Sequence, residues 1–311
     1  MRDYPVIDAH VHTYPSRDIG RQAMMGTGRT DYGGTIDELT GIMDRAGIEQ
    51  AVMVNMTPVA DMRDAALAKI PGDLTPERRA KAEADVQQQL IGRLQRRNQW
   101  TCQVAREDPR LVAFIGLDPS MGEEGMVKEI EARQAEGARG IKLHPAAQRF
   151  YPADRRLWPV YERAQELGLP VIYHSGAFAL GPRALDFAEP RQFPEVLQAF
   201  PRLTVVLAHT GFGDFDACQA LARTYANVFF DCCAVVNGSE PSPVLGDDEA
   251  AAALRQVGSG RVMFGSDYPW FDPALDAARI QRLPLSDAEK RAVLYDNAVR
   301  ILCLPAPDLE P

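Results

Sequence analysis

Several features that would define a membrane, secreted or nucleotide-binding protein are missing from this sequence. None of its apolar runs is long enough to span a bilayer. The five cysteines are an odd number without a Cys-x-x-Cys pair, so we expect reduced, buried thiols rather than a disulfide framework. No Gly-x-Gly-x-x-Gly motif follows an early strand, which argues against a dinucleotide-binding fold. Internal repeats and low-complexity linkers are absent too, which predicts one domain over residues 1–311.

Positive charge is also in short supply. Lysine and arginine number 34 against 43 aspartates and glutamates, which gives a net charge of −9 and a pI near 5.2. Nucleic acids and anionic membranes are bound by basic surfaces, so we expect neither as a partner. The chain passes directly from Met1 into an apolar run at residue 6, which leaves no room for a secretory signal peptide. We therefore expect a cytoplasmic protein that binds a small-molecule substrate, and a homo-oligomer stays open.

Apolar runs rich in Val, Ile, Leu and Phe alternate with longer amphipathic segments. The expected strands are residues 6–12, 51–56, 112–118, 140–144, 170–174, 204–209, 227–232 and 262–267. The expected helices are residues 36–46, about 76–107, 126–136, 157–167, 193–200, 215–225, 249–257 and 273–302. Strands of this composition, each followed by a helix, are typical of a parallel sheet covered by helices. Eight such units predict an α/β protein with a single-domain (β/α)8 TIM barrel.

Two long connections interrupt this regular alternation. Residues 13–34 follow the first strand and residues 57–74 follow the second. Both leave from the carboxyl ends of strands, so we expect irregular loops that overhang the barrel mouth. Long loops in compact domains are more often functional than idle, although flexible surface insertions are the alternative.

All five histidines stand at the carboxyl ends of expected strands. They are His10, His12, His144, His174 and His209, and the last expected strand ends in Asp267. In a TIM barrel these ends meet at one face, where active sites are built. Because residues two apart on a strand share a face, His10 and His12 point the same way. Several imidazoles, one carboxylate and a water form the ligand shell of a catalytic Zn²⁺ or a similar divalent ion.

Each histidine also has a simpler explanation. A single histidine at a strand end is more often a hydrogen-bonded structural residue than a metal ligand. The joint pattern is harder to explain by packing, because burying five imidazoles without a metal carries a large desolvation cost. Metal binding is therefore the favoured interpretation.

The same segments carry a resemblance to a known family. The matching motifs are DAHVH at 8–12, GIKLHP at 140–145, PVIYHSG at 170–176, AHTG at 208–211, FGSDYP at 264–269 and YDNAVRIL at 295–302. With these motifs in this order, the whole chain resembles the amidohydrolase superfamily. More narrowly, it is similar to the amidohydrolase-related (amidohydrolase 2) branch of metal-dependent TIM-barrel hydrolases and decarboxylases.

The resemblance implies a role for each matching residue. His10, His12, His174 and Asp267 would bind a single metal ion. His209 would bind a second ion or, with one ion, orient water or polarise the substrate. Asp267 and His209 would be the catalytic residues, and Asp267 would carry the proton between the attacking water and the leaving group.

The fourth strand offers two further candidates, Lys142 and His144. In some family members a carboxylated lysine at this strand bridges two metal ions, and Lys142 matches that place. Alternatively, His144 takes part in the site while Lys142 remains an ammonium that faces the substrate's negative charge. One ion is favoured and two stay open. Zn²⁺ is favoured over Mn²⁺, although both suit a shell of nitrogen and oxygen ligands.

The expected reaction is hydrolysis of a small ester, lactone or amide by a metal-activated water. The alternative is metal-dependent, non-oxidative decarboxylation of an aromatic or unsaturated carboxylic acid, which would use the same residues. A metal-free lactonase and a catalytically inactive barrel are further alternatives. Candidate substrate-binding residues are Gln148, Arg149, Arg183 and Trp270. The arginines are proposed because a guanidinium pairs bidentately with a carboxylate.

Overall fold

Eight parallel strands form the centre of the molecule, each paired with the next in the order β1 to β8. Their bounds are β1 Val6–Val11, β2 Ile48–Val54, β3 Leu111–Gly116, β4 Gly140–Leu143, β5 Val171–Tyr173, β6 Val205–Leu207, β7 Val228–Asp231 and β8 Val262–Met263. The computed structural model describes residues 4–25, 31–176, 186–235 and 245–304. The predicted single-domain (β/α)8 TIM barrel is confirmed, and each strand overlaps its expected range, although β2 begins at Ile48 rather than residue 51 and β8 ends at Met263 rather than residue 267.

Backbone hydrogen bonds between the ends of the chain close the barrel. The amide of Ala9 donates to the carbonyl of Phe264 at 2.9 Å, and the amide of Asp267 donates to the carbonyl of His10 at 2.9 Å. Val11 also forms a parallel bridge with Tyr268. Closure therefore places Asp267 beside the His-x-His pair, although more than 250 residues separate them in the sequence.

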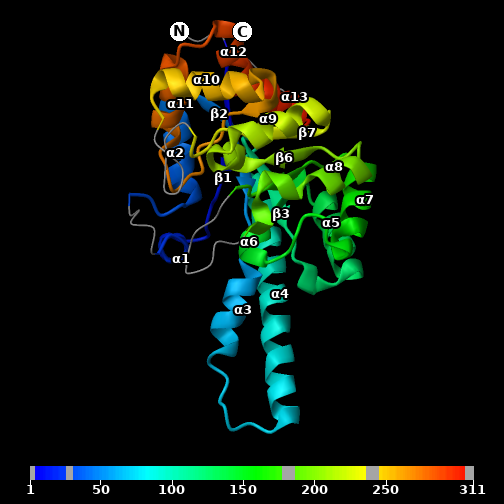
Figure 1. Ribbon diagram of the computed structural model, residues 1–311. Coiled ribbons are helices and arrows are strands. Elements are labelled where there is room, and N and C mark those ends of the chain that lie inside the picture. Colours follow the sequence, from blue (N-terminus) through cyan, green and yellow to red (C-terminus); the bar gives the residue numbers. More distant parts are fainter. Residues whose placement is uncertain (1–3, 26–30, 177–185, 236–244, 305–311) are drawn as a thin grey trace.

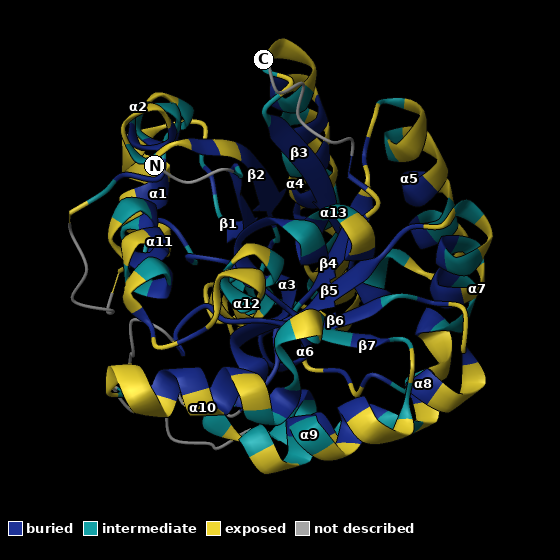
Figure 2. Ribbon diagram, turned by 90° about the horizontal axis from the view of Figure 1, so that it is seen from above, coloured by how far each residue is buried: buried dark blue, intermediate teal, exposed yellow. Residues whose placement is uncertain are grey.

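Helices surround the barrel, with their exposed faces outward (Figure 2). Their bounds are α1 Arg17–Ala23, α2 Ile36–Ala46, α3 Val59–Leu67, α4 Pro76–Glu107, α5 Glu123–Ala135, α6 Pro145–Gln148, α7 Trp158–Leu167, α8 Pro194–Ala199, α9 Phe215–Thr224, α10 Asp247–Val257, α11 Pro273–Arg282, α12 Asp287–Arg291 and α13 Asn297–Ile301. The expected closing helix at 273–302 is instead three α-helices and a π-helical turn, η7 Ala292–Asp296. Within the described residues, no helix is both long and apolar enough to cross a membrane.

Apolar side chains fill the barrel and the space beneath its helices. One cluster joins inward-facing strand residues such as Ile7 and Phe114 to Ala298 and Ile301 of α13. A larger cluster joins the outward-facing strand residues to the surrounding helices. Since both faces of the sheet are covered, the strands read as continuous apolar runs. Within the strands, Asp8 of β1 and Gln50 of β2 are buried polar exceptions.

The two long connections are more ordered than predicted. The first contains α1, whose N-cap Ser16 accepts a hydrogen bond from the amide of Ile19. The second contains α3, which packs through Val59 against Leu90 and Leu94 of α4. Together, α3 and the first half of α4 form an arm that projects from the barrel (Figure 1). The prediction that residues 57–74 are irregular is therefore wrong for Val59–Leu67, because α4 supplies apolar side chains against which α3 packs.

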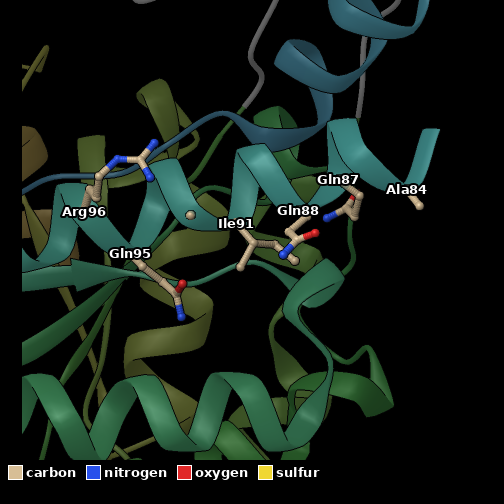
Figure 3. A pocket seen from close by; sticks show the side chains of 7 residues that line it. Ala84, Gln87, Gln88, Ile91, Gln95 and Arg96 are labelled. Carbon is tan, nitrogen blue, oxygen red and sulfur yellow. The ribbon is translucent and has the colours of Figure 1, made fainter. Parts of the chain in front are cut away.

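A shallow groove lies on the surface of α4 (Figure 3). Its lining residues are Ala84, Gln87, Gln88, Ile91, Gly92, Gln95 and Arg96. This lining contains no histidine and no carboxylate, so the groove offers none of the chemistry predicted for the site.

Candidate active site

Three side chains that were predicted as metal ligands converge at the carboxyl ends of β1 and β8. Nε2 of His10 lies 3.3 Å from Nε2 of His12. Oδ1 of Asp267 lies 3.6 Å from Nε2 of His10 and 3.4 Å from Nε2 of His12. His10 is fully buried, whereas His12 and Asp267 are partly exposed. The triangle of these three atoms, which we call the ligand triangle, therefore opens toward the barrel mouth.

The ligand triangle fits a small divalent cation. Zn²⁺ binds imidazole nitrogens and carboxylate oxygens at about 2.0–2.1 Å, so two tetrahedral ligand atoms lie about 3.3–3.4 Å apart. The three edges of the triangle are 3.3, 3.4 and 3.6 Å, close to that spacing. A second trio, His10, Asp231 and Cys233, is also compact. Its 2.7 Å contact between Nδ1 of His10 and Oδ2 of Asp231 is a hydrogen bond and leaves no space for an ion.

The five histidine rings form one continuous row across the strand ends. The ring centroids of His10 lie 5.2 Å from those of both His12 and His209. His209 lies 4.7 Å from His174, which in turn stacks on His144 at 3.9 Å. The prediction that all five histidines share one site is therefore supported by their packing.

His174 contacts the neighbouring histidines rather than the ligand triangle. Its Nδ1 lies 3.1 Å from Nε2 of His209, a distance at which one of the two nitrogens carries a shared proton. Nδ1 of His209 is buried and has no hydrogen-bond partner in the part of the chain that the structure describes. The predicted role of His174 as a metal ligand stays a prediction, and His209 offers one nitrogen for a substrate or a second ion.

Asp231, at the end of β7, forms hydrogen bonds with two residues of this row. Its Oδ2 accepts the hydrogen bond from Nδ1 of His10, and its Oδ1 accepts one from the backbone amide of His209 at 2.8 Å. The thiol of Cys233 also donates to Oδ1. Asp231 was not predicted, although it ends β7, much as Asp267 ends an apolar run that was expected to be a strand.

A short left-handed turn carries His209 into the site. Within η5 (Ala208–Gly213), φ is 59° at His209, 45° at Thr210 and 52° at Phe212. This region costs an L-residue about 1–2 kcal/mol, so the turn must be held by other contacts. Thr210 Oγ1 donates to the carbonyl of Asp231 at 2.6 Å, and Ser175 Oγ donates to the carbonyl of Ala208 at 2.6 Å. These bonds fix the direction of the His209 ring.

Burial sets the protonation states of the site. It lowers the pKa of every one of the five histidines, to about 4 for His209, so the rings are neutral at neutral pH. Burial alone would raise the pKa of Asp231, but its contacts with His10, His209 and Cys233 lower that pKa to about 2. For Asp267 too, the hydrogen bond from His12 and the nearby imidazoles outweigh burial and lower the pKa. Neutral imidazoles beside ionised carboxylates are the forms that bind metal ions.

The candidates on the fourth strand lie in the same row. Lys142 is fully buried, and its Nζ lies 3.2 Å from Nε2 of His10. Burial lowers the pKa of Lys142, while the charges of Asp231 and Asp267 oppose that shift. His144 lies at the far end of the row, and its Nδ1 accepts a hydrogen bond from the amide of Ala147 at 3.2 Å. Lys142 is thus the nearer of the two to the ligand triangle.

The predicted substrate-binding residues occupy four different settings. Gln148 is buried and accepts a hydrogen bond from the amide of His144 at 2.8 Å. Arg149 forms exposed ion pairs with Asp61 and Asp64 of α3. The ring of Trp270 lies edge-on to His12 at 5.3 Å. Arg183 lies outside the described residues. Of the three candidates that the structure describes, Trp270 is the one that contacts a residue of the ligand triangle.

One further residue reaches the strand ends from α4 and was not predicted. The guanidinium of Arg97 lies 4.7 Å from the ring of Tyr14 and 4.9 Å from that of Trp100. It donates to the carbonyl of Thr13, immediately after His12, and to the side chain of Asn55. Arg97 therefore fixes the path of the chain as it leaves β1.

A (β/α)8 barrel with a His-x-His pair, three more histidines and an aspartate at its strand ends defines a class of TIM-barrel proteins with a candidate metal centre. The family model described as amidohydrolase matches residues 7–304. The chain belongs to the amidohydrolase family, as the sequence motifs predicted. No curated protein matches the chain significantly.

Solved structures match almost the whole chain at low identity. An uncharacterised TIM-barrel protein from Bordetella bronchiseptica is 20% identical with a TM-score of 0.70, covering 96% of this chain and 99% of that one. A 2,6-dihydroxybenzoate decarboxylase from Rhizobium is 16% identical with a TM-score of 0.67, covering 97% and 99%. A 5-carboxyvanillate decarboxylase from Novosphingobium aromaticivorans, complexed with manganese and 4-hydroxy-3-methoxy-5-nitrobenzoic acid, is 16% identical with a TM-score of 0.67, covering 97% of each chain. At these identities the likeness shows the fold alone.

Proposed function

We propose that the protein is a metal-dependent, non-oxidative decarboxylase of a small aromatic or unsaturated carboxylic acid. The observation that carries this proposal is the ligand triangle of His10, His12 and Asp267, with edges of 3.3–3.6 Å. The fold likeness to two decarboxylases, one of them with manganese bound, moves this reaction ahead of hydrolysis. The spacing of the triangle favours Zn²⁺, and Mn²⁺ is the alternative.

Decarboxylation requires a group that stabilises negative charge on the substrate and a group that supplies a proton. When bound, a divalent cation would hold a substrate oxygen and stabilise the negative charge that develops there. As the carbon–carbon bond breaks, carbon dioxide leaves and its electron pair stays on the substrate carbon. That carbon must then take a proton. Nε2 of His209 and Nδ1 of His174 share a hydrogen bond of 3.1 Å beside His10. We assign this neutral pair as a proton relay: Nδ1 of His209 would give its proton to the carbon while Nε2 of His209 takes the shared proton from His174, and His174 would take a replacement proton from water.

Hydrolysis of a small ester, lactone or amide is the second candidate. The observation that favours it is the position of Asp267, whose ionised Oδ1 lies 3.4 Å from Nε2 of His12. A carboxylate in that position would accept a proton from an attacking water and return it to the leaving atom. In that reaction His209 would polarise the carbonyl.

A single substrate panel distinguishes the candidates. Protein loaded with Zn²⁺ or Mn²⁺ is incubated with 2,6-dihydroxybenzoate and 5-carboxyvanillate, and carbon dioxide release is measured. The same preparations are tested with a lactone and an aryl ester by proton release. Asp267→Asn is the matched negative control, because it removes the charge and keeps the shape.

Each outcome of this experiment supports a different function. Carbon dioxide release that stops on chelation and in the Asp267→Asn variant supports the proposal. Lactone or ester hydrolysis alone would replace it with the second candidate. Hydrolysis that survives chelation would point to a metal-free lactonase. A metal-loaded protein that turns over no member of a broad panel of acids and esters would indicate an inactive barrel.

A further inference from the structure

We propose that Asp231 is a positioning residue that sets both halves of the site, the ligating ring of His10 and the turn that carries His209. This inference rests on the proposed metal centre. Asp231 does not belong to the ligand triangle, and it is fully buried at the end of β7. One of its carboxylate oxygens contacts His10 of β1, and the other contacts His209 of the turn η5.

Asp231 fixes the ring proton of His10. A metal ion binds the nitrogen of an imidazole that carries no proton, so the position of the ring proton decides whether His10 is a ligand. Nδ1 of His10 faces Oδ2 of Asp231 at 2.7 Å, and an ionised carboxylate only accepts hydrogen bonds. Nδ1 must therefore carry the proton. Nε2 therefore keeps its lone pair, which Nζ of Lys142 contacts at 3.2 Å while no metal is bound. The same nitrogen lies 3.3 Å from Nε2 of His12 and 3.6 Å from Oδ1 of Asp267.

Asp231 also holds the turn that carries His209. Oδ1 of Asp231 accepts the backbone amide of His209 at 2.8 Å, and its carbonyl accepts Thr210 Oγ1 at 2.6 Å. These are the first two residues of the left-handed run in η5, with φ of 59° and 45°. A backbone held in this strained region depends on such bonds. Loss of Oδ1 as an acceptor would release the turn and redirect the ring of His209.

An asparagine cannot replace this aspartate. Its side chain has one accepting oxygen and one donating nitrogen, whereas Asp231 accepts on both sides. If the amide oxygen of Asn faces His10, its nitrogen meets the amide hydrogen of His209. If the oxygen faces His209, its nitrogen donates to Nδ1 of His10 and moves the ring proton to Nε2. Either way, one half of the site is lost while the volume of the side chain is kept.

The test compares Asp231→Asn with a buried aspartate at another strand end. Asp118, after β3, accepts hydrogen bonds from Ser120 and Gln148, so Asp118→Asn is the matched control. Cys233→Ser keeps a donor to Oδ1 and is the second control. The dissociation constant for Zn²⁺ is measured by competition with a chromophoric chelator, alongside the melting temperature. We expect Asp231→Asn to weaken Zn²⁺ binding about 10- to 100-fold, as loss of such a partner typically does. Asp118→Asn and Cys233→Ser should bind within about threefold of the wild type.

A second measurement requires neither bound metal nor a folded Asp231 variant. In the metal-free wild type, ¹⁵N spectra of labelled histidines, assigned with His10→Gln, should show a protonated Nδ1 and an unprotonated Nε2 on His10. The reverse tautomer would overturn the inference, and so would unchanged Zn²⁺ affinity in a folded Asp231→Asn. If the wild type binds no metal, the proposed function fails, and the tautomer still decides whether Asp231 positions His10.

Discussion

Nε2 of His12 and Oδ1 of Asp267 lie 3.4 Å apart at the seam where the barrel closes. His12 directly follows β1 and Asp267 lies in the segment after β8, and backbone bonds from Ala9, His12 and Asp267 across this seam fix their separation. Any change that loosens the contact between β1 and β8 should therefore weaken the site as well as the fold.

Replacing Asp267 with asparagine should lower turnover on whichever substrate is found by at least about 100-fold. The variant keeps the size of the side chain but loses the charge that binds a cation and accepts a proton. Steady-state kinetics with saturating metal measure the effect. Asp248→Asn on the exposed face of α10 makes the same change in net charge and should leave turnover unaltered. Equal turnover in the two variants would remove Asp267 from the catalytic group.

The stability of the metal-free protein should fall as the pH drops below about 6.5, in part through His209. Burial lowers the pKa of His209 from 6.5 to about 4, so between these values the unfolded chain binds a proton that the folded chain does not. Each such histidine removes up to about 1.4 kcal/mol of unfolding free energy per pH unit on acidification. This destabilisation is absent well above pH 6.5 and grows as the pH falls toward 4.

Urea unfolding with a chelator at pH 7, 6 and 5 measures this effect in the wild type and in His209→Gln. Asp8 acts in the opposite direction, since burial raises its pKa to about 7, but it is present in both proteins. The stability difference between the two proteins should therefore shrink as the pH falls. A difference that is constant over this range would mean that His209 is not held neutral in the fold.

Adding a methyl group at Gly265 should damage the site from within the barrel. A Cβ there would lie 2.7 Å from Cβ of His10 and 3.3 Å from Sγ of Cys233, so β8 would have to move away from β1. Gly265→Ala should cost about 1–3 kcal/mol of stability and weaken metal binding. A Cβ at Gly260 meets nothing within 4 Å, so Gly260→Ala is the matched control. Calorimetry measures the stability of both variants, and titration measures their metal affinity. Similar stability and affinity in the two variants would show that the chain at Gly265 is not tightly packed against His10.

Arg149 should be dispensable for catalysis if its partners are Asp61 and Asp64. Both ion pairs are exposed, and such pairs contribute about 0–1 kcal/mol to stability. Arg149→Ala should then leave the melting temperature and the KM for a carboxylic acid substrate nearly unchanged, within about twofold. A large rise in KM with constant kcat would instead restore the sequence-based interpretation of Arg149 as a substrate clamp.

The barrel was predictable because buried parallel strands require apolar runs that end where the chain leaves the sheet. The fourth strand was expected at 140–144 and is found at Gly140–Leu143. The long helix was expected at about 76–107 and spans Pro76–Glu107, beginning after the N-cap Thr75. The same logic located the histidines and Asp267, since polar residues at such ends share one face.

Contacts between strands distant in sequence were not predictable in the same way. Asp231 is recognisable only once β7 and β1 are placed in the barrel, where alternate strands contribute to the same internal layer. Arg97 reaches Thr13 from a helix 84 positions further along, and no local pattern indicates that contact. Arg149 was predicted to bind a substrate carboxylate because it follows the fourth strand closely in the sequence. Its side chain turns instead to α3, a helix that sequence analysis did not expect.

The central claim is that His10, His12 and Asp267 form a metal centre, and metal content per chain tests it most directly. Plasma mass spectrometry is applied to gently purified wild type and to His12→Ala, both grown with added zinc and manganese. We predict about one equivalent of divalent metal in the wild type and almost none in the variant, since the variant loses one of three protein ligands. A metal-free wild type, or equal metal in both proteins, would contradict the account.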